Sequence, residues 1–303
     1  MNLKNFLVLN LLAALWGGSF LFMRLAASAL SPVLLIELRV LIAGLALLFY
    51  AILIGKAPVF KGKRLHYLVL GTINAGLPFT LIAASEVHLT ASVSSILNAT
   101  TPLFTILVAR FWIKERISIK KMAGVFLGIA GVAVLVGGFH SNGQASLLLL
   151  SAAFSLLAAI SYGFGSVYTK VKFTDEQPLA LTIGQQLGAA LILIPFALPQ
   201  TGHMKQLSDP LLLASVVALA ILCTSVAYIF FFYLIHSVGP TRTTSVTLLV
   251  SVYGVLWGAI FLHEKLSLST LAGMLVILSS MVLINGWKLP LLGRLFSKHA
   301  SYR

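Results

Sequence analysis

The chain has 303 residues, of which 59% are hydrophobic and only 9% are charged, and its formal net charge at pH 7 is +14. Soluble globular domains carry about 25% charged residues, so this composition excludes a soluble domain and indicates a protein of the lipid bilayer. A membrane-spanning helix needs about 20 mostly apolar residues, and about ten such helices would leave no room for a separate soluble domain.

Ten apolar windows follow one another along the chain and are separated by short polar connections. The first window could be mistaken for a signal peptide, but it is long, has no convincing cleavage site and carries Trp16 and Arg24, so we expect it to remain as a transmembrane helix. We therefore expect an all-α, polytopic membrane protein with ten transmembrane helices. The windows lie at residues 4–26, 32–54, 66–86, 91–112, 120–138, 147–169, 179–198, 211–235, 242–262 and 267–287.

The basic residues gather in alternate connections between these windows. If the N-terminus lies in the cytoplasm, 17 of the 21 Lys and Arg residues lie on the cytoplasmic side. This asymmetry is typical of the positive-inside rule, and it places both termini of a multi-pass protein of the cell (inner) membrane in the cytoplasm. The high positive charge therefore reflects topology, and we expect the lipid bilayer and no nucleic acid as a partner.

A short phrase occurs twice, each time between two apolar windows: WIKERIS at 112–118 and FLHEKLS at 261–267. Glu264 follows Glu115 by 149 positions, and Gly273 follows Gly124 by the same offset. Such internal self-similarity indicates a duplicated unit of five helices.

The duplication predicts the organisation of the chain. Because five is odd, the second unit must cross the membrane in the opposite sense, so we expect two inverted five-helix repeats around a central cavity. Inverted repeats are typical of secondary transporters, in which they form two alternative gates around one binding site. The expected units are a first repeat at 1–138, an external linker at 139–146, a second, inverted repeat at 147–287 and a basic cytoplasmic tail at 288–303.

The whole chain resembles the EamA-type branch of the drug/metabolite transporter superfamily. The resemblance implies a ten-helix carrier of small metabolites, often amino acids or related compounds, that usually exports them. The second copy of the longest motif has Ser251 where the first has Pro102, so a matching helix kink is not implied there. The motifs that carry the resemblance are WGGSF (16–20), PVLLIELR (32–39), PLFTILVARFWIKERISIKKMAG (102–124) and SVYGVLWGAIFLHEKLSLSTLAG (251–273).

Polar and aromatic residues near the bilayer midplane are the candidates for a substrate site, because such groups bind the polar and apolar parts of a small ligand in a cavity. The alternative is that they hold helices together or bond to their own backbone. Pro78 and Pro102 are candidate kinks or hinges. The substrate-site candidates are Trp16, Asn74, Asn98, Thr101, Tyr162, Thr224, Tyr228, Ser251 and Tyr253.

Ionised side chains inside the apolar windows are costly, so Glu37, Arg39 and Arg24 need an explanation. Glu37 and Arg39 are two positions apart and point to different sides of one helix, whereas Arg24 on the first helix can pair with Glu37. A structural ion pair and a role in substrate carboxylate binding or proton coupling are both open. We expect Glu86 to lie solvated at the external rim.

The glycines and the repeated glutamates have simpler interpretations. We expect Gly124, Gly128 and Gly273 to allow close helix packing. Glu115 and Glu264 lie in tight connections, where a carboxylate can accept N–H bonds at the next helix start or pair with an adjacent basic residue. A role in gating is the alternative.

Catalytic and metal sites find little support in the sequence. The phrase His263-Glu264 resembles the start of a zinc-protease HEXXH motif, but Ser267 stands where the second His is needed. Cys223 is the single cysteine, which excludes an intramolecular disulfide and a cysteine-rich metal site. We expect no enzyme activity, no metal and no cofactor.

Secondary transport of a small-molecule substrate by alternating access is therefore the favoured function. An amino acid or related compound, moved outward, is the expected substrate, and drugs or other metabolites are the alternative cargo. A channel-like or sensor membrane protein is the alternative class, although the sequence shows no repeated selectivity filter or charged pore ring. Protons are a candidate coupling ion, and monomer and homodimer are both open.

Overall fold

A computed structural model describes residues 2–60, 62–138, 145–239, 243 and 246–285. Within these ranges every regular element is a helix. Eight helical segments are long and apolar enough to cross a membrane, and two shorter apolar helices, Val246–Phe261 and Leu268–Ile284, complete the expected ten. This confirms the all-α, polytopic fold. The expected basic tail at 288–303 and most of the linker at 139–146 lie outside the described residues.

The first five spans contain eight elements, because the third and fourth spans are interrupted. The third contains a π-helical segment, η1, and the fourth breaks at Ala99 and Thr100. The elements are α1 (Leu3–Leu30), α2 (Pro32–Leu53), α3 (Arg64–Gly71), η1 (Thr72–Gly76), α4 (Leu77–Ser85), α5 (Ala91–Asn98), α6 (Thr101–Trp112) and α7 (Ile119–Gly137).

The last five spans repeat this scheme. A π-helical segment, η4, again interrupts the third span of the set, and it begins 146 positions after η1. The elements are α8 (Ala145–Lys172), α9 (Pro178–Ala197), the 3-10 segment η3 (Leu198–Ser208), α10 (Pro210–Val217), η4 (Ala218–Val226), α11 (Ala227–Val238), α13 (Val246–Phe261) and α14 (Leu268–Asn285).

The interruptions lie near the two predicted prolines. Pro78 is in the first turn of α4, directly after η1, and Pro102 is in the first turn of α6, directly after the break in the fourth span. Proline lacks the N–H that an interior helical position needs, so it is tolerated at a first turn. Both prolines therefore mark places where a span changes its helical geometry.

The repeated phrase forms the same turn in both copies. Lys114 and His263 both adopt left-handed backbone conformations, with φ of 56° and 52°. The serine that ends each copy then caps the next helix: Ser118 Oγ accepts from Lys121 N at 3.3 Å, and Ser267 Oγ accepts from Thr270 N at 3.1 Å. Capping by Ser explains why both copies end in this residue.

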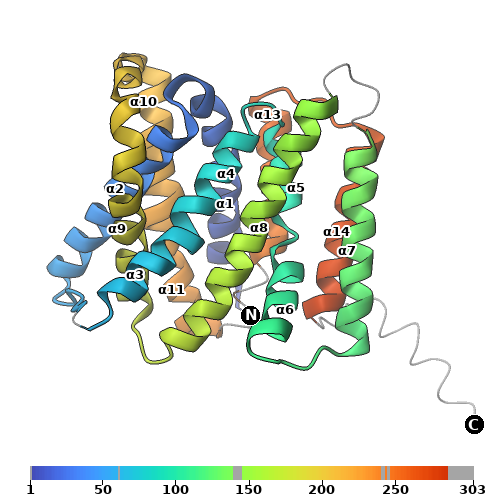
Figure 1. The fold of residues 1–303 in the computed structure, drawn as a ribbon, viewed down its shortest axis with the longest axis horizontal. Coiled ribbons are helices and arrows are strands. Elements are labelled where there is room, and N and C mark those ends of the chain that lie inside the picture. Colours follow the sequence, from blue (N-terminus) through green and yellow to red (C-terminus); the bar gives the residue numbers. More distant parts are fainter. Residues whose placement is uncertain (1, 61, 139–144, 240–242, 244–245, 286–303) are drawn as a thin grey trace, which may run out of the picture.

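These two turns lie at opposite ends of the molecule. Figure 1 shows the connection from α6 to α7 at the bottom and the connection from α13 to α14 at the top. The matched turns therefore point in opposite directions, as inverted repeats require. We call the end with the connections α2–α3, α6–α7 and α8–α9 the basic face, and the end with the connections α4–α5 and α13–α14 the opposite face.

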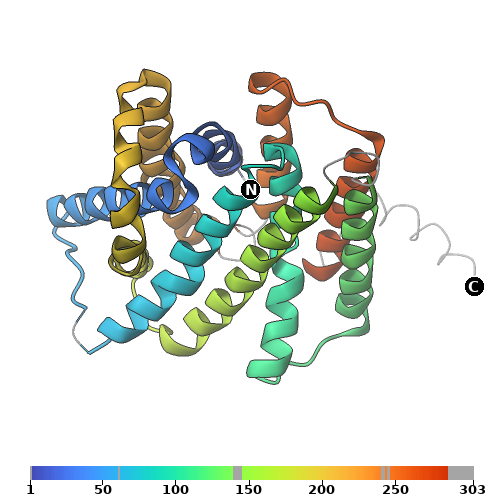
Figure 2. The ribbon, with the colours of Figure 1, turned by 45° about the horizontal axis from the view of Figure 1, so that its top comes forward.

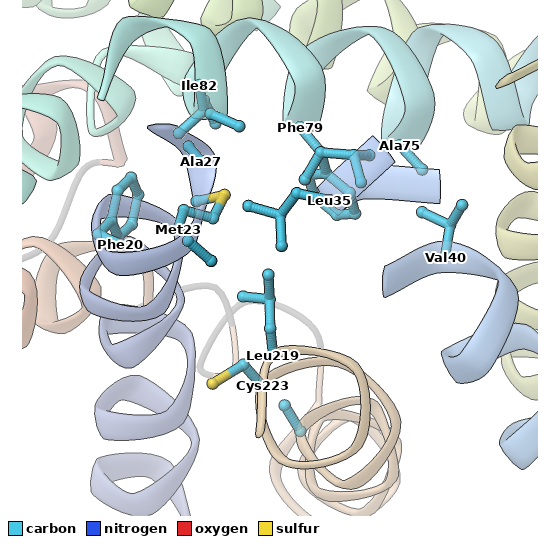
Figure 3. Close-up of a cluster of buried hydrophobic side chains, with 14 of the residues drawn as sticks. Phe20, Met23, Ala27, Leu35, Val40, Ala75, Phe79, Ile82, Leu219 and Cys223 are labelled. Carbon is cyan, nitrogen blue, oxygen red and sulfur yellow. The ribbon is translucent and has the colours of Figure 1, made fainter. Parts of the chain in front are cut away.

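Six clusters of buried hydrophobic side chains hold the described helices together. Side chains from α1, α2, α4 and η4 form the largest buried cluster, in which Met23, Leu35 and Phe79 meet Leu219 (Figure 3). The pair α7 and α14 lies to one side of this bundle in both ribbon views (Figures 1 and 2). Large apolar side chains on the outer surface, such as Phe126 at 66% exposure, face the region that lipid occupies in a membrane.

Three glycines lie where the expected close packing occurs. A Cβ on Gly124 would lie 2.7 Å from Ile284 Cγ1 of α14, and one on Gly273 would lie 2.8 Å from Leu135 Cβ of α7. A Cβ on Gly128 would lie 2.5 Å from Leu103 Cδ1 of α6. A larger residue at any of these positions would push the helices apart.

Candidate functional site

A cavity of about 330 Å³ lies among the helices of both repeats. Small-molecule sites in proteins have volumes of roughly 300–1,000 Å³, so this cavity suits a small ligand. No acidic side chain lines it, although the described residues include all seven Asp and Glu residues of the chain. Its polar and aromatic lining consists of Trp16, Ser19, Phe20, Arg39, Asn74, Phe79, Asn98, Thr101, Tyr162, Ser166, Tyr228, Phe231 and Thr247.

Six of the nine substrate-site candidates line this cavity. They come from α1, η1, α5 and α6 of the first repeat and from α8 and α11 of the second. Phe79 and Phe231 also line the cavity and were not predicted, because an aromatic residue in an apolar window carries no signal that separates a cavity wall from a lipid contact. The six candidates in the lining are Trp16, Asn74, Asn98, Thr101, Tyr162 and Tyr228.

The other three candidates lie behind the lining. Thr224 accepts a hydrogen bond from Arg39, Ser251 Oγ donates to the carbonyl oxygen of Ser95 at 3.0 Å, and Tyr253 bonds Asn10 at 3.3 Å. Ser251 and Tyr253 therefore connect helices rather than line the cavity. For these two residues the alternative interpretation holds, in which a polar side chain joins two membrane helices.

Aromatic rings form one wall of the cavity. The Trp16 ring lies edge-on to Tyr228 at 5.9 Å between centroids and 5.4 Å from Phe231. Phe79 and Tyr162 form a second pair, edge-on at 6.2 Å. Such contacts fix the rings in place, so the wall offers a rigid apolar surface to a ligand.

A buried amide holds two polar groups of the lining. Asn74 Nδ2 donates to Gln185 Oε1 at 2.7 Å, and Gln185 Nε2 donates to the Tyr228 hydroxyl at 3.3 Å. Gln185 is only 4% exposed and does not line the cavity. Because the Tyr228 oxygen accepts from Gln185, its own O–H remains able to donate into the cavity. No motif in the sequence indicated this role for Gln185.

Arg39 is the one basic side chain in the lining of the described cavity, and it is 4% exposed. Its Nε donates to Thr224 Oγ1 at 3.0 Å, and its guanidinium carbon lies 3.8 Å from the centroid of the Phe79 ring. Thr224 in turn donates to the Leu219 carbonyl at 2.8 Å, which directs a lone pair towards Arg39. The side chain is therefore held from two sides.

The expected ion pair between Arg24 and Glu37 does not form among the described residues. Arg24 instead donates to the backbone carbonyls of Glu86 and Val87, the latter at 2.9 Å, because its long side chain reaches the end of α4. Glu37 is buried but does not line the cavity. The expectation for Glu86 was also wrong, since its exposed fraction is 0%.

At the opposite face, hydrogen bonds to Glu264 join the two repeats. Glu264 accepts three hydrogen bonds at the start of α5: from Ala91 N at 2.7 Å, from Ser92 N at 3.0 Å and from Ser92 Oγ at 2.5 Å. A Cβ on Gly258 of α13 would lie 2.4 Å from Glu264 Oε2, so this approach needs a glycine. The carboxylate of Glu264 therefore binds a helix of the other repeat. We expected it to bind the start of the next helix or to pair with the adjacent Lys265, and it does neither.

The cavity reaches the surface towards the basic face. Ser166 is exposed there, and it lines both the central cavity and a small cleft that includes Glu115. Glu115 forms ion pairs with Lys170 at 3.1 Å and Lys121 at 3.6 Å instead of the adjacent Arg116. The hydrogen bond from Lys170 lowers the pKa of the Glu115 carboxyl. Of the two matched glutamates, Glu115 therefore pairs with lysine side chains at the basic face, whereas Glu264 binds a helix N-terminus at the opposite face.

A multi-pass membrane protein with a cavity between two inverted helical repeats belongs to the class of membrane transporters. Comparison with known families agrees, since the EamA-like transporter family matches residues 4–137 and again 149–286. The chain belongs to this family, as the resemblance predicted. A solved crystal structure with 19% identity covers 98% of this chain and 99% of its own, with a TM-score of 0.61, and shows the same fold.

Several proteins from other organisms align with nearly the whole chain. The "Uncharacterized transporter YvbV" of Bacillus subtilis is 27% identical, over 93% of this chain and 92% of its own length. The "Probable amino-acid metabolite efflux pump" of Salmonella typhimurium is also 27% identical, over 93% and 94%. The "Uncharacterized inner membrane transporter YedA" of Escherichia coli is 26% identical, over 89% and 87%.

Proposed function

We propose that the protein is a secondary transporter that exports a small metabolite, an amino acid or a related compound, by alternating access. The observation that carries the proposal is the cavity itself: it lies between two inverted repeats, which hydrogen bonds to Glu264 join at one face, and it reaches the surface at the other face. Inverted repeats let each half adopt the conformation of the other, which moves the opening from one face to the other.

The basic face is proposed to lie in the cytoplasm of the inner membrane, with both termini, because the positive-inside rule places Lys and Arg there. In this orientation the cavity is open to the cytoplasm, where an exporter loads its solute. The seal between Glu264 and α5 is then the closed outer gate. The relative named as an efflux pump for amino-acid metabolites supports the direction and the type of cargo.

The test is counterflow in liposomes. Purified protein is reconstituted, the vesicles are loaded with one unlabelled amino acid at a time, and uptake of the same labelled amino acid is followed with and without a pH gradient. The proposal expects a saturable initial rate that the internal solute stimulates, and a dependence on the pH gradient if protons are coupled. A rate that rises linearly with solute and is not stimulated from the other side indicates a channel and contradicts the proposal.

A further inference from the structure

The charge of the cavity lining limits which solutes can bind there. The lining carries one guanidinium, that of Arg39, and no carboxylate. Arginine stays protonated in proteins, so the cavity is positively charged whatever the surrounding pH. A solute with a net positive charge would be repelled there, because charges interact strongly in a low-dielectric interior.

Arg39 also makes no direct ion pair. In the described part of the chain, no acidic side chain lies at ion-pair distance from it. Its hydrogen bonds go to neutral atoms: Nε donates to Thr224 Oγ1, and Nη1 donates weakly to Met23 Sδ at 3.6 Å. The guanidinium has five N–H donors, so its Nη groups retain donors that no described residue accepts. A buried charge without a partner destabilises a protein strongly, and an anionic ligand would supply the partner.

The geometry prepares Arg39 for such a partner. The guanidinium carbon of Arg39 lies over the Phe79 ring, 3.8 Å from its centroid, and Thr224 accepts from Nε, so the Nη groups are the ones that retain donors. A planar guanidinium matches a carboxylate with two parallel N–H···O bonds, and this pairing is among the strongest hydrogen-bonded contacts in proteins. The aromatic wall beside it suits an apolar body.

A second unpaired polar group lines the same cavity. The Asn98 Oδ1 atom is buried and has no hydrogen-bond partner among the described residues. Buried polar atoms are normally paired, so an unpaired acceptor in a cavity is available to a hydrogen-bond donor of a ligand. An ammonium group on the solute would supply it.

We propose, building on the transport function proposed above, that the cavity selects solutes with one carboxylate and an apolar or aromatic body. The carboxylate binds the Nη groups of Arg39, the body packs against Trp16 and Tyr228, and in an α-amino acid the ammonium group donates to Asn98 Oδ1. Lipophilic cations and diamines are excluded from this site.

The test compares each carboxylate with its own amide. The protein in lipid nanodiscs is titrated with L-phenylalanine, L-tryptophan, L-leucine and phenylacetate, and with the four corresponding carboxamides, and the shift in Tm is recorded. Hydrogen bonds to a charged group contribute about 1.5–3 kcal/mol, so a binding carboxylate should be favoured over its amide by about 10- to 150-fold in Kd. This comparison needs no variant of the protein.

Variants then assign the preference to Arg39. Arg39→Gln should bind carboxylate and amide equally, Arg39→Lys should keep part of the preference because it keeps the charge without the fork, and Lys205→Gln, which is exposed and outside the cavity, should keep all of it. The proposal is overturned if no carboxylate in the panel binds, if amides or tetraphenylphosphonium bind as well as carboxylates, or if Arg39→Gln retains the preference.

The experiments can contradict the proposed ligand class and the proposed transport function independently. If counterflow shows no saturation while carboxylate binding depends on Arg39, the transport function is wrong and the ligand class stands. If counterflow of tetraphenylphosphonium is saturable, transport stands and the proposed ligand class is wrong.

Discussion

Glu264→Gln should open the seal at the opposite face. The substitution keeps the shape of the side chain but removes its charge, and it places an NH₂ group where the Oε2 atom accepts from Ser92 N and Ser92 Oγ. The hydrogen bond from Ala91 N to the remaining side-chain oxygen can persist. The Ser92 hydroxyl can rotate and accept from the new NH₂ group. The backbone N–H of Ser92, however, would face this NH₂ group and lose its acceptor.

The magnitude follows from the bonds that are lost. Losing one hydrogen bond to a charged acceptor weakens the seal by about 1.5–3 kcal/mol, and the helix N-terminus also loses a favourable negative charge. If these bonds exist only in the sealed state, the ratio of unsealed to sealed protein rises by about 10- to 150-fold.

The assay measures access to the cavity from outside the cell. Ile82 lines the cavity and is 2% exposed, so Ile82→Cys in a Cys223→Ala background reports on this seal. We expect a membrane-impermeant maleimide, added to intact cells, to label position 82 at least tenfold faster when Glu264→Gln is present.

The matched control is Glu115→Gln. Glu115 occupies the same place in the first repeat but is exposed and pairs only with Lys170 and Lys121. Exposed ion pairs contribute about 0–1 kcal/mol, so this variant should change labelling at position 82 by less than about fivefold. Equal labelling of both glutamate variants, or no change in Glu264→Gln, would refute a gate held by Glu264.

The remaining predictions concern groups that position the site. Gly258→Ala should also speed labelling at position 82, because a Cβ there lies 2.4 Å from Glu264 Oε2, whereas Ala109→Gly at the matched position should not. Gln185→Leu should lower the free energy of unfolding by about 1–3 kcal/mol, since it leaves the side chains of Asn74 and Tyr228 without their shared partner. It should also raise the KM for transport because Tyr228 loses its fixed position, and an unchanged KM together with an unchanged Tm would contradict this.

The sequence predicted the fold well because the bilayer allows few solutions. Apolar length fixes each span, and the lack of water forces the backbone into helices. The offset of 149 positions between Glu115 and Glu264 then indicated the repeat, and its odd helix number indicated the inversion. The structure adds that Ser118 and Ser267 cap the following helices, which explains the last residue of each phrase.

The partners of the charged residues were not predictable in the same way. Glu264 contacts residues 172 and 173 positions away, and Arg39 bonds Thr224 from 185 positions away. Such pairs depend on how the two repeats pack against each other, and the hydrophobic periodicity of the sequence holds no information on this packing. The same holds for Glu86, which we expected to be solvated because it lies at a helix end and which is fully buried.

Depth along a helix located part of the cavity but not the direction of each side chain. Asn74 and Asn98 were selected by depth alone, and both line the cavity. Ser251 and Tyr253 lie at similar depth and point to Ser95 and Asn10 instead. The π-helical segments also rotate the residues that follow them, and no residue pattern announces such a segment.

Labelling from the two sides of the membrane tests the inverted architecture most directly. Lys114 and Lys265 are exposed, belong to the matched turns and lie beside the two glutamates without being part of the seal. Each is replaced by cysteine in the Cys223→Ala background and treated with an impermeant maleimide in intact cells and in inverted vesicles. Position 265 should react in intact cells and position 114 only in inverted vesicles. Reaction of both positions from the same side would contradict the inverted repeat, and with it the alternating cavity.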